Sequence, residues 1–516
     1  MDAAEARDEP PVTGAGPRPA PGSPNGGSAP GGRGRDETSG PADRQGAAGS
    51  VEKLASRVAR LIEAEVIARG WPVGEVLDSE PVLRERYGVS RAVLREAARL
   101  LEHHQVARMR RGPGGGLVIC APDADPTVRA MVVYIEYVGT ELRDVLLARR
   151  LIEPVLGRLA AERIDEEGIT RLRATLAGEL SPPEAGEWAG ELFHTVLAEM
   201  TRNPALQLFI DVLEQLAYRY VALAGTMTED RVRRFRETTH RRHAGILDAT
   251  IAGDAPRAQH WLIEHLDEVT EWFQAALGDR ESGAGAGGGP AVRLAPVPVG
   301  LAAGRTLAEV VAVRIHEDIL GGGLEAGAVL GSEAELMERY DTSRAVLRAA
   351  VRLLEHHSVA TSRRGPGGGL VVTRQEPRAA IDATALYLAY RDATADDLRV
   401  VREAIEVGIV ARLAARRAEP AVAARLAALG DPPARPPASG AERDFHAVLA
   451  ELVGNPVLTL FLRILTELSR RTGRAGGCDG HGAGDHTGTE HREILAAVLA
   501  GDASLAQYRM RRHLAH

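Results

Sequence analysis

A long segment of this sequence occurs twice, at a constant separation. The string SRAVLR stands at 90–95 and again at 343–348, and RRGPGGGLV stands at 110–118 and again at 363–371. Both pairs are 253 residues apart (343 − 90 and 363 − 110). Solenoid repeats recur every 20–50 residues, roughly. The separation therefore indicates two copies of a whole module that contains many secondary-structure elements.

Length and composition limit what the two copies can be. The chain has 516 residues, so each copy has room for about two domains of ordinary size. The formal net charge is −8, so a surface that binds a polyanion has to be local. The two cysteines, Cys120 and Cys478, are too few for a disulfide framework. No apolar run reaches the roughly 20 residues of a membrane span. These features together predict a cytoplasmic protein without membrane contact.

Two segments are too poor in large apolar residues to fold by burial. Residues 1–50 consist mainly of Gly, Pro, Ala, Ser, Asp and Arg, and we expect a disordered tail there. Residues 278–305 have a similar composition and separate the two copies. As a flexible linker this segment would span about 30 Å on average. That length would allow the two copies to pack side by side.

Each copy begins with a short domain, at 51–121 and at 306–374, in which helical patterns end in a hairpin. In the first of these domains, apolar residues recur at helical spacing over 93–101. Ser90 precedes them as an N-cap whose oxygen can accept hydrogen bonds from first-turn amides. The short runs on either side of RRGPGGG indicate two strands joined by a Gly-rich turn. We therefore predict a winged helix-turn-helix domain, or head, in each copy.

The rest of each copy, at 126–277 and at 378–516, is a series of amphipathic helical runs. Asn203-Pro204 and Asn455-Pro456 each match an N-cap followed by proline at the first helical position, where its missing N–H costs nothing. The predicted fold is mainly α. It consists of two winged helix-turn-helix domains, each followed by an all-α helical bundle.

Arginines in the predicted heads are candidates for DNA contact. The residues at the start of the recognition helices are Ser90, Arg91 and Arg95 in the first copy and Ser343, Arg344 and Arg348 in the second. Two arginines four residues apart share one helix face, and each guanidinium can hold guanine in the major groove or grip a phosphate. The wings add cations suited to phosphate or minor-groove contact, namely Arg110, Arg111, Arg363 and Arg364. The alternative is a solvated, arginine-rich helix face, but the Ser cap, the Arg spacing and the basic turn recur together.

Histidines recur at fixed spacing in the two bundles. They are His194, His243 and His265 in the first bundle and His446, His491 and His513 in the second. The last two of each set are 22 residues apart (265 − 243 and 513 − 491). Imidazoles on three helices can converge with a carboxylate on a divalent transition metal of the Zn, Ni or Mn class, with one position left open for a ligand. A single histidine is more often hydrogen-bonded or exposed, so the prediction depends on the repeated set.

The expected carboxylate ligand differs between the two bundles. Glu442 stands four residues before His446 and shares its helix face, whereas Gly190 stands at the corresponding place of the first bundle. Glu191, Glu187 or a water molecule would have to fill that position. We therefore expect the two sites to differ in metal affinity, with the first site the weaker.

A further repeated pattern is an arginine four residues before a glutamate. Arg149 precedes Glu153 in this way, and Arg402 precedes Glu406. One interpretation is an ion pair on a helix surface, worth about 0.2–0.5 kcal/mol. The other is a cation that holds the carboxylate of a small effector. Both interpretations stay open.

The residues of both copies resemble a known family. Residues 79–116 contain, in this order, Ser-Glu, Leu, Tyr-Gly-Val-Ser-Arg, Arg-Glu-Ala, Leu-Glu and Arg-Gly-Pro-Gly-Gly-Gly. A helical domain follows, with Phe-His, Asn and two later histidines. This order resembles GntR-family transcriptional regulators of the FadR type, over about 51–278 and 305–516. The resemblance implies a winged helix that binds operator DNA and an all-α ligand-binding domain, called FCD. In that domain an acidic residue and three histidines hold a metal.

The resemblance also assigns roles to individual residues. It assigns operator contact to Ser90, Arg91, Arg95, Ser343, Arg344 and Arg348, metal binding to Glu442, His446, His491 and His513, and effector contact to Arg149 and Arg402. In the first bundle only His194, His243 and His265 match the metal-binding pattern. Many members have an arginine directly after the Ser-Glu of the second DNA-binding helix, where this chain has Pro81 and Ala334. Its operator therefore need not resemble the usual one.

These features together predict a ligand-responsive transcriptional repressor. Members of the family typically pair two identical chains, whereas here both copies share one chain. We therefore expect an intramolecular pseudo-dimer that binds double-stranded operator DNA of imperfect palindromic sequence. Further pairing of two such chains stays open. A small carboxylate effector, coordinated by the metal, would have to favour one arrangement of the heads to weaken operator binding.

Two alternatives come from other classes of protein. One is a metalloenzyme that acts on small carboxylates, because three histidines and a carboxylate could activate water. It is disfavoured because no separate general base is evident and the repeated arginines would be unexplained, so we assign no catalytic residue. The other alternative is a pure metal sensor without an organic effector.

Overall fold

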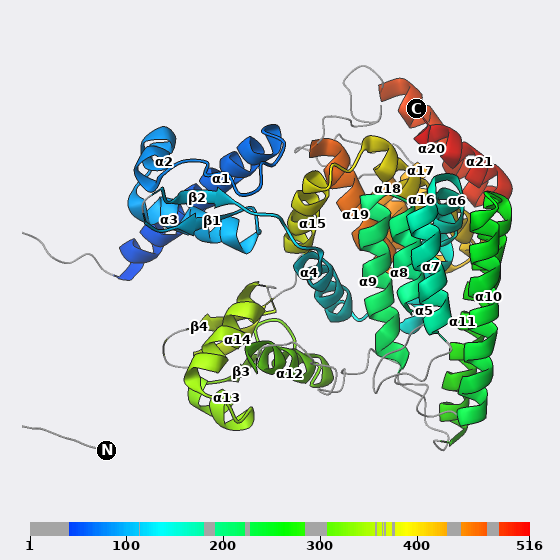
Figure 1. Ribbon diagram of the computed structural model, residues 1–516, viewed down its shortest axis with the longest axis horizontal. Coiled ribbons are helices and arrows are strands. Elements are labelled where there is room, and N and C mark those ends of the chain that lie inside the picture. The colour runs from blue at the N-terminus through cyan, green and yellow to red at the C-terminus, as the bar shows by residue number, and fades with distance from the viewer. Residues whose placement is uncertain are drawn as a thin grey trace, which may run out of the picture. The chain divides into compact units, whose positions relative to one another are not determined.

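The computed structural model describes residues 41–112, 114–179, 191–221, 228–283, 307–356, 359–363, 365, 368–373, 377–430, 445–471 and 484–515. Helices dominate these residues, and the short strands are confined to the two heads (Figure 1). The mainly α fold class is therefore confirmed. Among the helices described here, none is long and apolar enough to cross a membrane.

The first head combines helices with a two-stranded wing. Its elements are α1 (Pro41–Ala68), α2 (Glu80–Tyr87), α3 (Arg91–His103), β1 (Ala107–Arg110) and β2 (Gly116–Ile119). Ser90 caps α3, because its Oγ accepts a hydrogen bond from the amide of Val93 at 3.3 Å. Gly88 ends α2 with a φ of 61°, a left-handed conformation that glycine adopts without steric cost. The strands pair antiparallel, as a wing requires.

The second head repeats this arrangement with one more strand. Its elements are α12 (Leu307–Gly321), β3 (Val329–Gly331), α13 (Glu333–Arg339), α14 (Arg344–His356), β4 (Ala360–Arg363) and β5 (Gly369–Val372). The strand order is β3-β5-β4, whereas in the first head an isolated bridge between Val76 and Val118 stands in place of the third strand. Asp341 takes the left-handed φ (46°) at the position that corresponds to Gly88. The winged helix-turn-helix prediction is thus confirmed for both heads.

The wing turn explains why its glycines recur. Gly112 has a φ of 101° and Gly365 a φ of 105°, both in the left-handed half of the map. A Cβ atom on Gly115 would lie 2.4 Å from the carbonyl oxygen of Arg110, and one on Gly368 would lie 2.3 Å from that of Arg363. Only glycine allows the backbone to approach itself this closely, so both copies need glycine at these positions.

The first bundle consists of eight described helices: α4 (Ala124–Tyr137), α5 (Leu142–Ile152), α6 (Pro154–Arg163), α7 (Glu166–Gly178), α8 (Glu191–Met200), α9 (Pro204–Val221), α10 (Glu229–Ile251) and α11 (Ala255–Gly283). Pro154 separates α5 from α6, because proline has no N–H to donate to the preceding turn. The corresponding residue of the second bundle is Val407, and there one continuous helix runs through the position.

The second bundle has seven described helices: α15 (Arg378–Tyr390), α16 (Ala395–Arg416), α17 (Pro420–Gly430), α18 (Phe445–Val453), α19 (Pro456–Arg471), α20 (Gly484–Ala500) and α21 (Ala503–Leu514). Helix α16 is the counterpart of α5 and α6 together. Helices α18, α20 and α21 correspond to α8, α10 and α11, which carry the repeated histidines of the first bundle. The predicted all-α bundles are confirmed.

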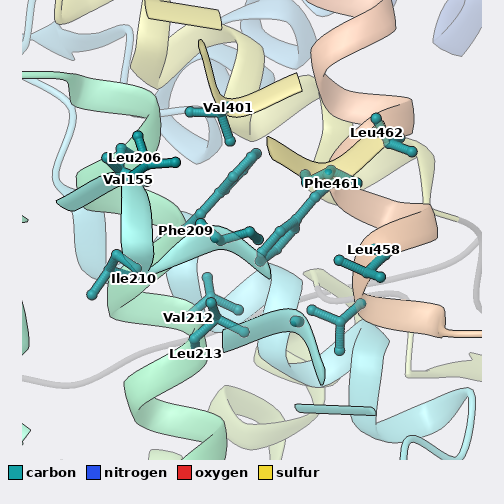
Figure 2. Packing of buried hydrophobic residues seen from close by; sticks show 14 of the residues in the cluster. Val155, Leu206, Phe209, Ile210, Val212, Leu213, Val401, Leu458, Phe461 and Leu462 are labelled. Carbon is teal, nitrogen blue, oxygen red and sulfur yellow. The ribbon is translucent and has the colours of Figure 1, made fainter. Parts of the chain in front are cut away.

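The two bundles share one hydrophobic core. A single cluster of buried residues includes Leu206 and Phe209 of α9 together with Leu458 and Phe461 of α19. Figure 2 shows these side chains packed around the two phenylalanine rings. The core of this part of the chain is therefore continuous between the bundles, and burial of apolar area stabilises both bundles at once.

A reciprocal pair of hydrogen bonds accompanies this core. Asn203 caps α9, since its Oδ1 accepts from the amide of Leu206 at 2.9 Å, and its Nδ2 donates to the carbonyl oxygen of Asp397 in the second bundle at 3.0 Å. Asn455 caps α19 in the same way, and its Nδ2 donates to the carbonyl oxygen of Asp144 in the first bundle at 2.9 Å. Asp144 and Asp397 occupy the same position in the two copies. The two hydrogen bonds are therefore equivalent, as they would be across a two-fold interface.

Two helices extend into the segments expected to be a disordered tail and a flexible linker. Helix α1 begins at Pro41, inside the tail expected at 1–50, and α11 continues to Gly283, inside the linker expected at 278–305. Extending an existing helix adds hydrogen bonds without a new nucleus, so residues of moderate propensity continue it. Residues 1–40 and 284–306 lie outside the described part of the chain, and there both predictions remain untested.

Candidate metal centres and nucleic-acid interface

Three histidines converge in the first bundle, from α8 (His194), α10 (His243) and α11 (His265). The Nε2 atom of His194 lies 3.2 Å from that of His243 and 3.2 Å from that of His265, and the last two are 3.4 Å apart. All three side chains are buried. Nitrogens bound to a tetrahedral ion at about 2.0–2.1 Å would be about 3.3–3.4 Å apart. The three rings therefore stand where three ligands of one ion would stand.

The second bundle repeats this arrangement on α18 (His446), α20 (His491) and α21 (His513). The Nε2 atom of His513 lies 3.2 Å from that of His491 and 3.2 Å from that of His446. His446 and His513 are buried, and His491 is partly exposed. The histidines that the spacing predicted as one set are thus brought together in both bundles.

Carboxylates orient the rings of the first triad. The Nδ1–H of His243 donates to Oε1 of Glu179 at 2.6 Å, and Nδ1 of His194 lies 2.7 Å from Oε2 of the buried Glu153. A proton on Nδ1 leaves the Nε2 lone pair free, and this lone pair points toward the other two rings. Three such lone pairs at close range repel one another unless a cation lies between them.

The second triad has equivalent carboxylates. Nδ1 of His446 contacts Oε2 of Glu406, and Nδ1 of His513 lies 2.8 Å from Oε2 of Glu490. Glu406 corresponds to Glu153, so this orienting carboxylate is common to both triads. Among the described residues, Glu179 and Glu490 contact rings that do not correspond, His243 in the first triad and His513 in the second.

The ionisation of these groups suits metal binding near neutral pH. Burial lowers the pKa of His243 to about 4, although Glu179 opposes the shift. Burial, together with the neighbouring His243 and His194, lowers the pKa of His265 well below its ordinary value. Burial alone would raise the pKa of Glu153, but Arg149 and His194 outweigh it and hold that pKa at about 2. His243 and His265 are thus neutral donors and Glu153 is an anion, as a divalent cation requires.

The predicted fourth ligand of each centre cannot be placed. Glu442, Gly190 and Glu187 lie outside the described residues, and only the backbone of Glu191 is described. The expectation of an acidic ligand at 442, and of a weaker first site, stays a prediction. Three histidine nitrogens per bundle are the donors that the described residues bring together.

Arg149 and Arg402 are both engaged by glutamates. Arg149 is buried, its Nε contacts Glu153, and its Nη2 donates to Oε1 of Glu214 at 2.6 Å. The Nε of Arg402 donates to Oε1 of Glu406 at 2.5 Å. Each arginine therefore belongs to the layer of charges behind a triad. Contact with an effector stays a prediction for both.

The predicted DNA-reading arginines are exposed at the start of the recognition helices. Arg91 pairs with Glu80 across 2.6 Å, and the Nε atoms of Arg344 and Arg348 lie 3.6 and 2.8 Å from Glu333. Exposed ion pairs of this kind are worth about 0–1 kcal/mol, so a phosphate or a base can replace the glutamate. Arg95 is also exposed.

The remaining predicted contacts lie in the caps and the wings. Ser343 caps α14 by accepting from the amide of Val346 at 3.4 Å, as Ser90 does in the first head. In the wings, Nη2 of Arg110 donates to the carbonyl oxygen of Gly114 at 3.0 Å, and Arg111 and Arg363 are exposed. Arg364 lies outside the described residues.

Sequence reasoning missed the outer carboxylates. The sequence predicts Glu153 and Glu406 only as ion-pair partners of arginines, although their repetition in both copies is a usable signal. Glu179 and Glu490 were not singled out, because they stand at unrelated positions of the two copies and no spacing marks them. The sequence does not show which carboxylate meets which ring.

Winged heads with exposed arginines on their recognition helices, each joined to a bundle with a histidine triad, define a class of DNA-binding regulator. Residues 54–116 and 307–370 match the profile of the bacterial regulatory proteins of the gntR family, and residues 144–268 and 397–516 match the profile of the FCD domain. The chain therefore belongs to the GntR family and contains the GntR helix-turn-helix and the FCD domain twice each. It is a DNA-binding transcriptional regulator.

Curated relatives support this assignment and the reading of the repeat. The Uxu operon regulator of Haemophilus influenzae is 26% identical over 230 residues, which cover 42% of this chain and 81% of that protein. RmpR of Mycobacterium gastri is 30% identical over 223 residues (42% and 78%), and the HTH-type transcriptional repressor NanR of Escherichia coli is 26% identical over 233 residues (43% and 86%). Each alignment covers most of the relative but less than half of this chain. The relatives are transcriptional regulators and not enzymes.

Proposed function

We propose that this chain is a ligand-responsive repressor that acts as an intramolecular pseudo-dimer. Its two heads would bind the half-sites of an imperfect palindromic operator in double-stranded DNA. A metal of the Zn, Ni or Mn class in the bundles would help to bind a small carboxylate effector, which would weaken operator binding. As a regulator of transcription it would act where the chromosome lies, in the cytoplasm.

The continuous core between the bundles supports the pseudo-dimer. Phe209 and Phe461 stack within it, and Asn203 and Asn455 form reciprocal hydrogen bonds beside it. Two heads joined through one folded pair of bundles have a high effective concentration for each other's half-site, so the second half-site is bound more readily than by a free head. The heads differ in sequence, for example at Glu96 and Ala349, so the two half-sites should differ as well.

The converging imidazoles support the metal. Nitrogen donors in a buried site suit zinc, nickel or related ions better than magnesium or calcium, which prefer oxygen ligands. When bound, the ion would supply a positive charge and an open coordination position for an anionic oxygen of the effector. The chain's own residues would do the rest, since the histidines hold the ion and the glutamates behind them orient the rings.

Repression is the sign of regulation that we favour. The relative NanR is named a transcriptional repressor. A carboxylate that binds one arrangement of the bundles better than another would favour that arrangement. The separation of the heads would then no longer match the separation of the two half-sites in the operator.

A pure metal sensor is the second candidate. Its support is that both arginines expected to hold an effector, Arg149 and Arg402, are engaged by glutamates of the chain. In that case the metal alone would change the affinity for DNA. The two candidates differ in whether a carboxylate adds to the effect of the metal.

The central experiment selects the bound DNA and then measures its affinity. Random duplexes are selected with the full-length chain, and the affinity for the enriched site is compared between wild type and Arg344→Ala/Arg348→Ala at several salt concentrations. We expect weaker binding and a smaller salt dependence in the variant, because phosphate or base contacts are lost. Arg399→Ala, at an exposed position of α16 in the second bundle, is the matched control. Unchanged operator affinity in the double variant, or no enriched sequence, would refute the proposal.

The metal is tested by elemental analysis of the same preparations. Purified wild type is compared with His446→Ala/His491→Ala and with His194→Ala/His243→Ala. Each double variant should lose the ion of its own bundle, and equal metal content in all three proteins would reject the sites. Titration of the metal-free and the metal-loaded repressor with DNA, each with and without a small carboxylate such as glycolate, then separates the effector-responsive repressor from the pure sensor.

A further inference from the structure

The contact between the two bundles combines a large residue with the smallest one. Helix α5 of the first bundle packs on α16 of the second. Leu151 of α5 lies so close to Gly408 of α16 that a Cβ atom on the glycine would stand 2.5 Å from Cδ2 and 3.0 Å from Cγ of the leucine. Glycine is unfavourable in the interior of a helix. Its place in the middle of α16 is therefore explained by the space that Leu151 occupies.

The corresponding residues of the two copies have different sizes. The offset of 253 residues relates Leu151 to Ala404 and Val155 to Gly408 (404 − 151 and 408 − 155). The first bundle thus has the larger residue at both positions, and the second bundle has the smaller. In a two-fold interface each position faces the other position of the partner. Since Leu151 faces Gly408, the same relation makes Val155 face Ala404, and a large residue meets a small one on each side of the axis.

Pairs of identical bundles would lack this fit. Two first bundles would place Leu151 of each against Val155 of the other, although even a Cβ atom at that place comes too close to the leucine. Two second bundles would place Ala404 against Gly408 and would leave space that the side chains of the unlike pair fill. The sizes therefore favour the unlike pair over both like pairs.

A polar contact between the bundles has the same asymmetry. Arg391 follows α15 of the second bundle, and its Nη2 donates to Oε1 of Gln207 on α9 of the first at 3.2 Å. Burial and neighbouring carboxylates raise the pKa of Asp211, also on α9, to about 7, and Arg391 opposes this shift. The residue of the first bundle that corresponds to Arg391 is Val138 (391 − 138 = 253). Two first bundles would thus offer an apolar side chain where Gln207 and Asp211 now meet a cation.

We propose that the two bundles are complementary partners, so that the surface on α5 and α9 of the first bundle accepts the second bundle and disfavours a copy of itself. The inference rests on the proposed pseudo-dimer and deepens it, because it names the partner that each bundle selects. The covalent connection is then not needed for this selection. Every pair of bundles carries one head of each kind, as an operator with two unlike half-sites requires.

The test cuts the connection between the copies and lets the bundles choose their partners. A protease site is inserted in 284–306, outside the described residues, and the purified full-length chain is cleaved. Samples with and without ¹⁵N are mixed and kept in mild urea until unlike pairs of mixed label show that the halves have exchanged. Native mass spectrometry then counts the pairs. In wild type we expect almost only unlike pairs, whereas pairing without preference would make about half of all pairs alike.

Two variants test the two contacts separately. Leu151→Ala/Gly408→Val gives both bundles the same residues at these positions, so like pairs should rise to as much as about half of all pairs. Arg391→Val removes the polar contact and should raise like pairs by a smaller amount. It changes an exposed residue, so it decides the question if the double variant does not fold. Leu176→Ala, on α7, which packs on α8 and α10 of its own bundle, is the control and should pair as wild type does.

The outcomes separate this inference from the pseudo-dimer on which it rests. If wild type pairs without preference, the bundles are interchangeable and the inference is wrong, while the pseudo-dimer stands. If neither variant forms more like pairs than wild type, these contacts do not select the partner, and the inference is again wrong. If cleaved wild type gives single halves instead of pairs, the pseudo-dimer itself is refuted and the inference falls with it.

Discussion

Phe209 of the first bundle stacks on Phe461 of the second, with ring centroids 3.9 Å apart and planes 8° apart. The two residues occupy the same position in the two copies, so each copy meets its own equivalent across the contact. A contact of a residue with its counterpart is the signature of a two-fold interface between identical subunits. Here the same geometry lies inside one chain, and the ring pair is part of a core rather than of a subunit interface.

Removing either ring should destabilise both bundles. Phe461→Ala leaves a cavity beside Phe209, and we expect a loss of about 3–5 kcal/mol in the free energy of unfolding. Urea unfolding followed by circular dichroism measures it, with Phe209→Ala as the symmetric comparison. The double variant should lose less than the two single losses together, because the second substitution removes a ring that has already lost its partner. Strict additivity would contradict a direct stack.

The asparagine caps have a separable second role. Asn455→Asp keeps an oxygen that can cap α19 but removes the amide that donates to Asp144, whereas Asn455→Ala removes both. Loss of a cap costs about 0.5–2 kcal/mol, and loss of a hydrogen bond that leaves a carbonyl unsatisfied adds about 1–3 kcal/mol. We expect Asp to be intermediate between Asn and Ala in thermal unfolding. Equal stability of wild type and the Asp variant would show that the contact between the bundles contributes nothing.

The carboxylate behind His446 should tune the metal affinity. Glu406→Gln weakens the hydrogen bond that orients the ring and lowers the basicity of its Nε2, so the metal affinity of the second centre should fall about 10–100-fold. Competition with a chromophoric chelator measures the affinity. Glu403→Gln on the same helix, where Glu403 pairs with Arg399 at 3.3 Å in an exposed position, is the control. An effect of equal size in both variants would assign the loss to helix charge rather than to ring orientation.

Glu333 competes with DNA for the guanidiniums of the second recognition helix. Its Oε1 lies 2.8 Å from Nε of Arg348 and 3.6 Å from Nε of Arg344. Glu333→Gln should therefore increase operator affinity, by up to about fivefold, since an exposed pair is worth about 0–1 kcal/mol. Fluorescence anisotropy with the selected duplex measures it. Weaker binding in this variant would mean that Glu333 positions the arginines instead of competing with DNA.

The metal-free protein should lose stability in acid over a defined range. His243 has a pKa of about 4 in the fold, because burial disfavours its charged form, and about 6.5 when unfolded. Between these values the unfolded state binds more protons than the folded state, so the free energy of unfolding falls as the pH falls from about 6.5 to about 4. Urea midpoints measured in EDTA across this range test it. His243→Gln should show a shallower slope, and an unchanged slope would exclude His243 as its source.

Most of the architecture could be predicted because the same sequence patterns occur in both copies. Helical spacing, the Ser90 cap and the repeated glycines define the heads, and the equal spacing of His243–His265 and His491–His513 identifies residues on neighbouring helices. These features are local or periodic, so a single sequence contains them. The break between α5 and α6 is also a local feature, because it occurs at Pro154. The second copy has Val407 at this position, and its helix is not interrupted.

Other parts depend on contacts that no spacing records. Asn203 was expected as a cap, but its donation to Asp397 depends on how the two bundles pack. Glu179 reaches His243 from a helix end 64 residues away, a contact that no spacing in the sequence marks. Glu214 likewise contacts Arg149 only because α9 packs beside α5, and no spacing in the sequence records that contact.

The covalent joining of the two copies also changes how such a protein can evolve. In an assembly of identical subunits every mutation appears on both sides of the axis, so a residue that suits one side must be tolerated on the other. A chain that folds Phe209 against Phe461 within itself is released from that constraint, and each side of the axis can accept mutations of its own. Two differences between corresponding positions are then expected in a chain that descends from a symmetric ancestor. The first copy has Pro154 where the second has Val407, and Glu214 where the second has Thr466.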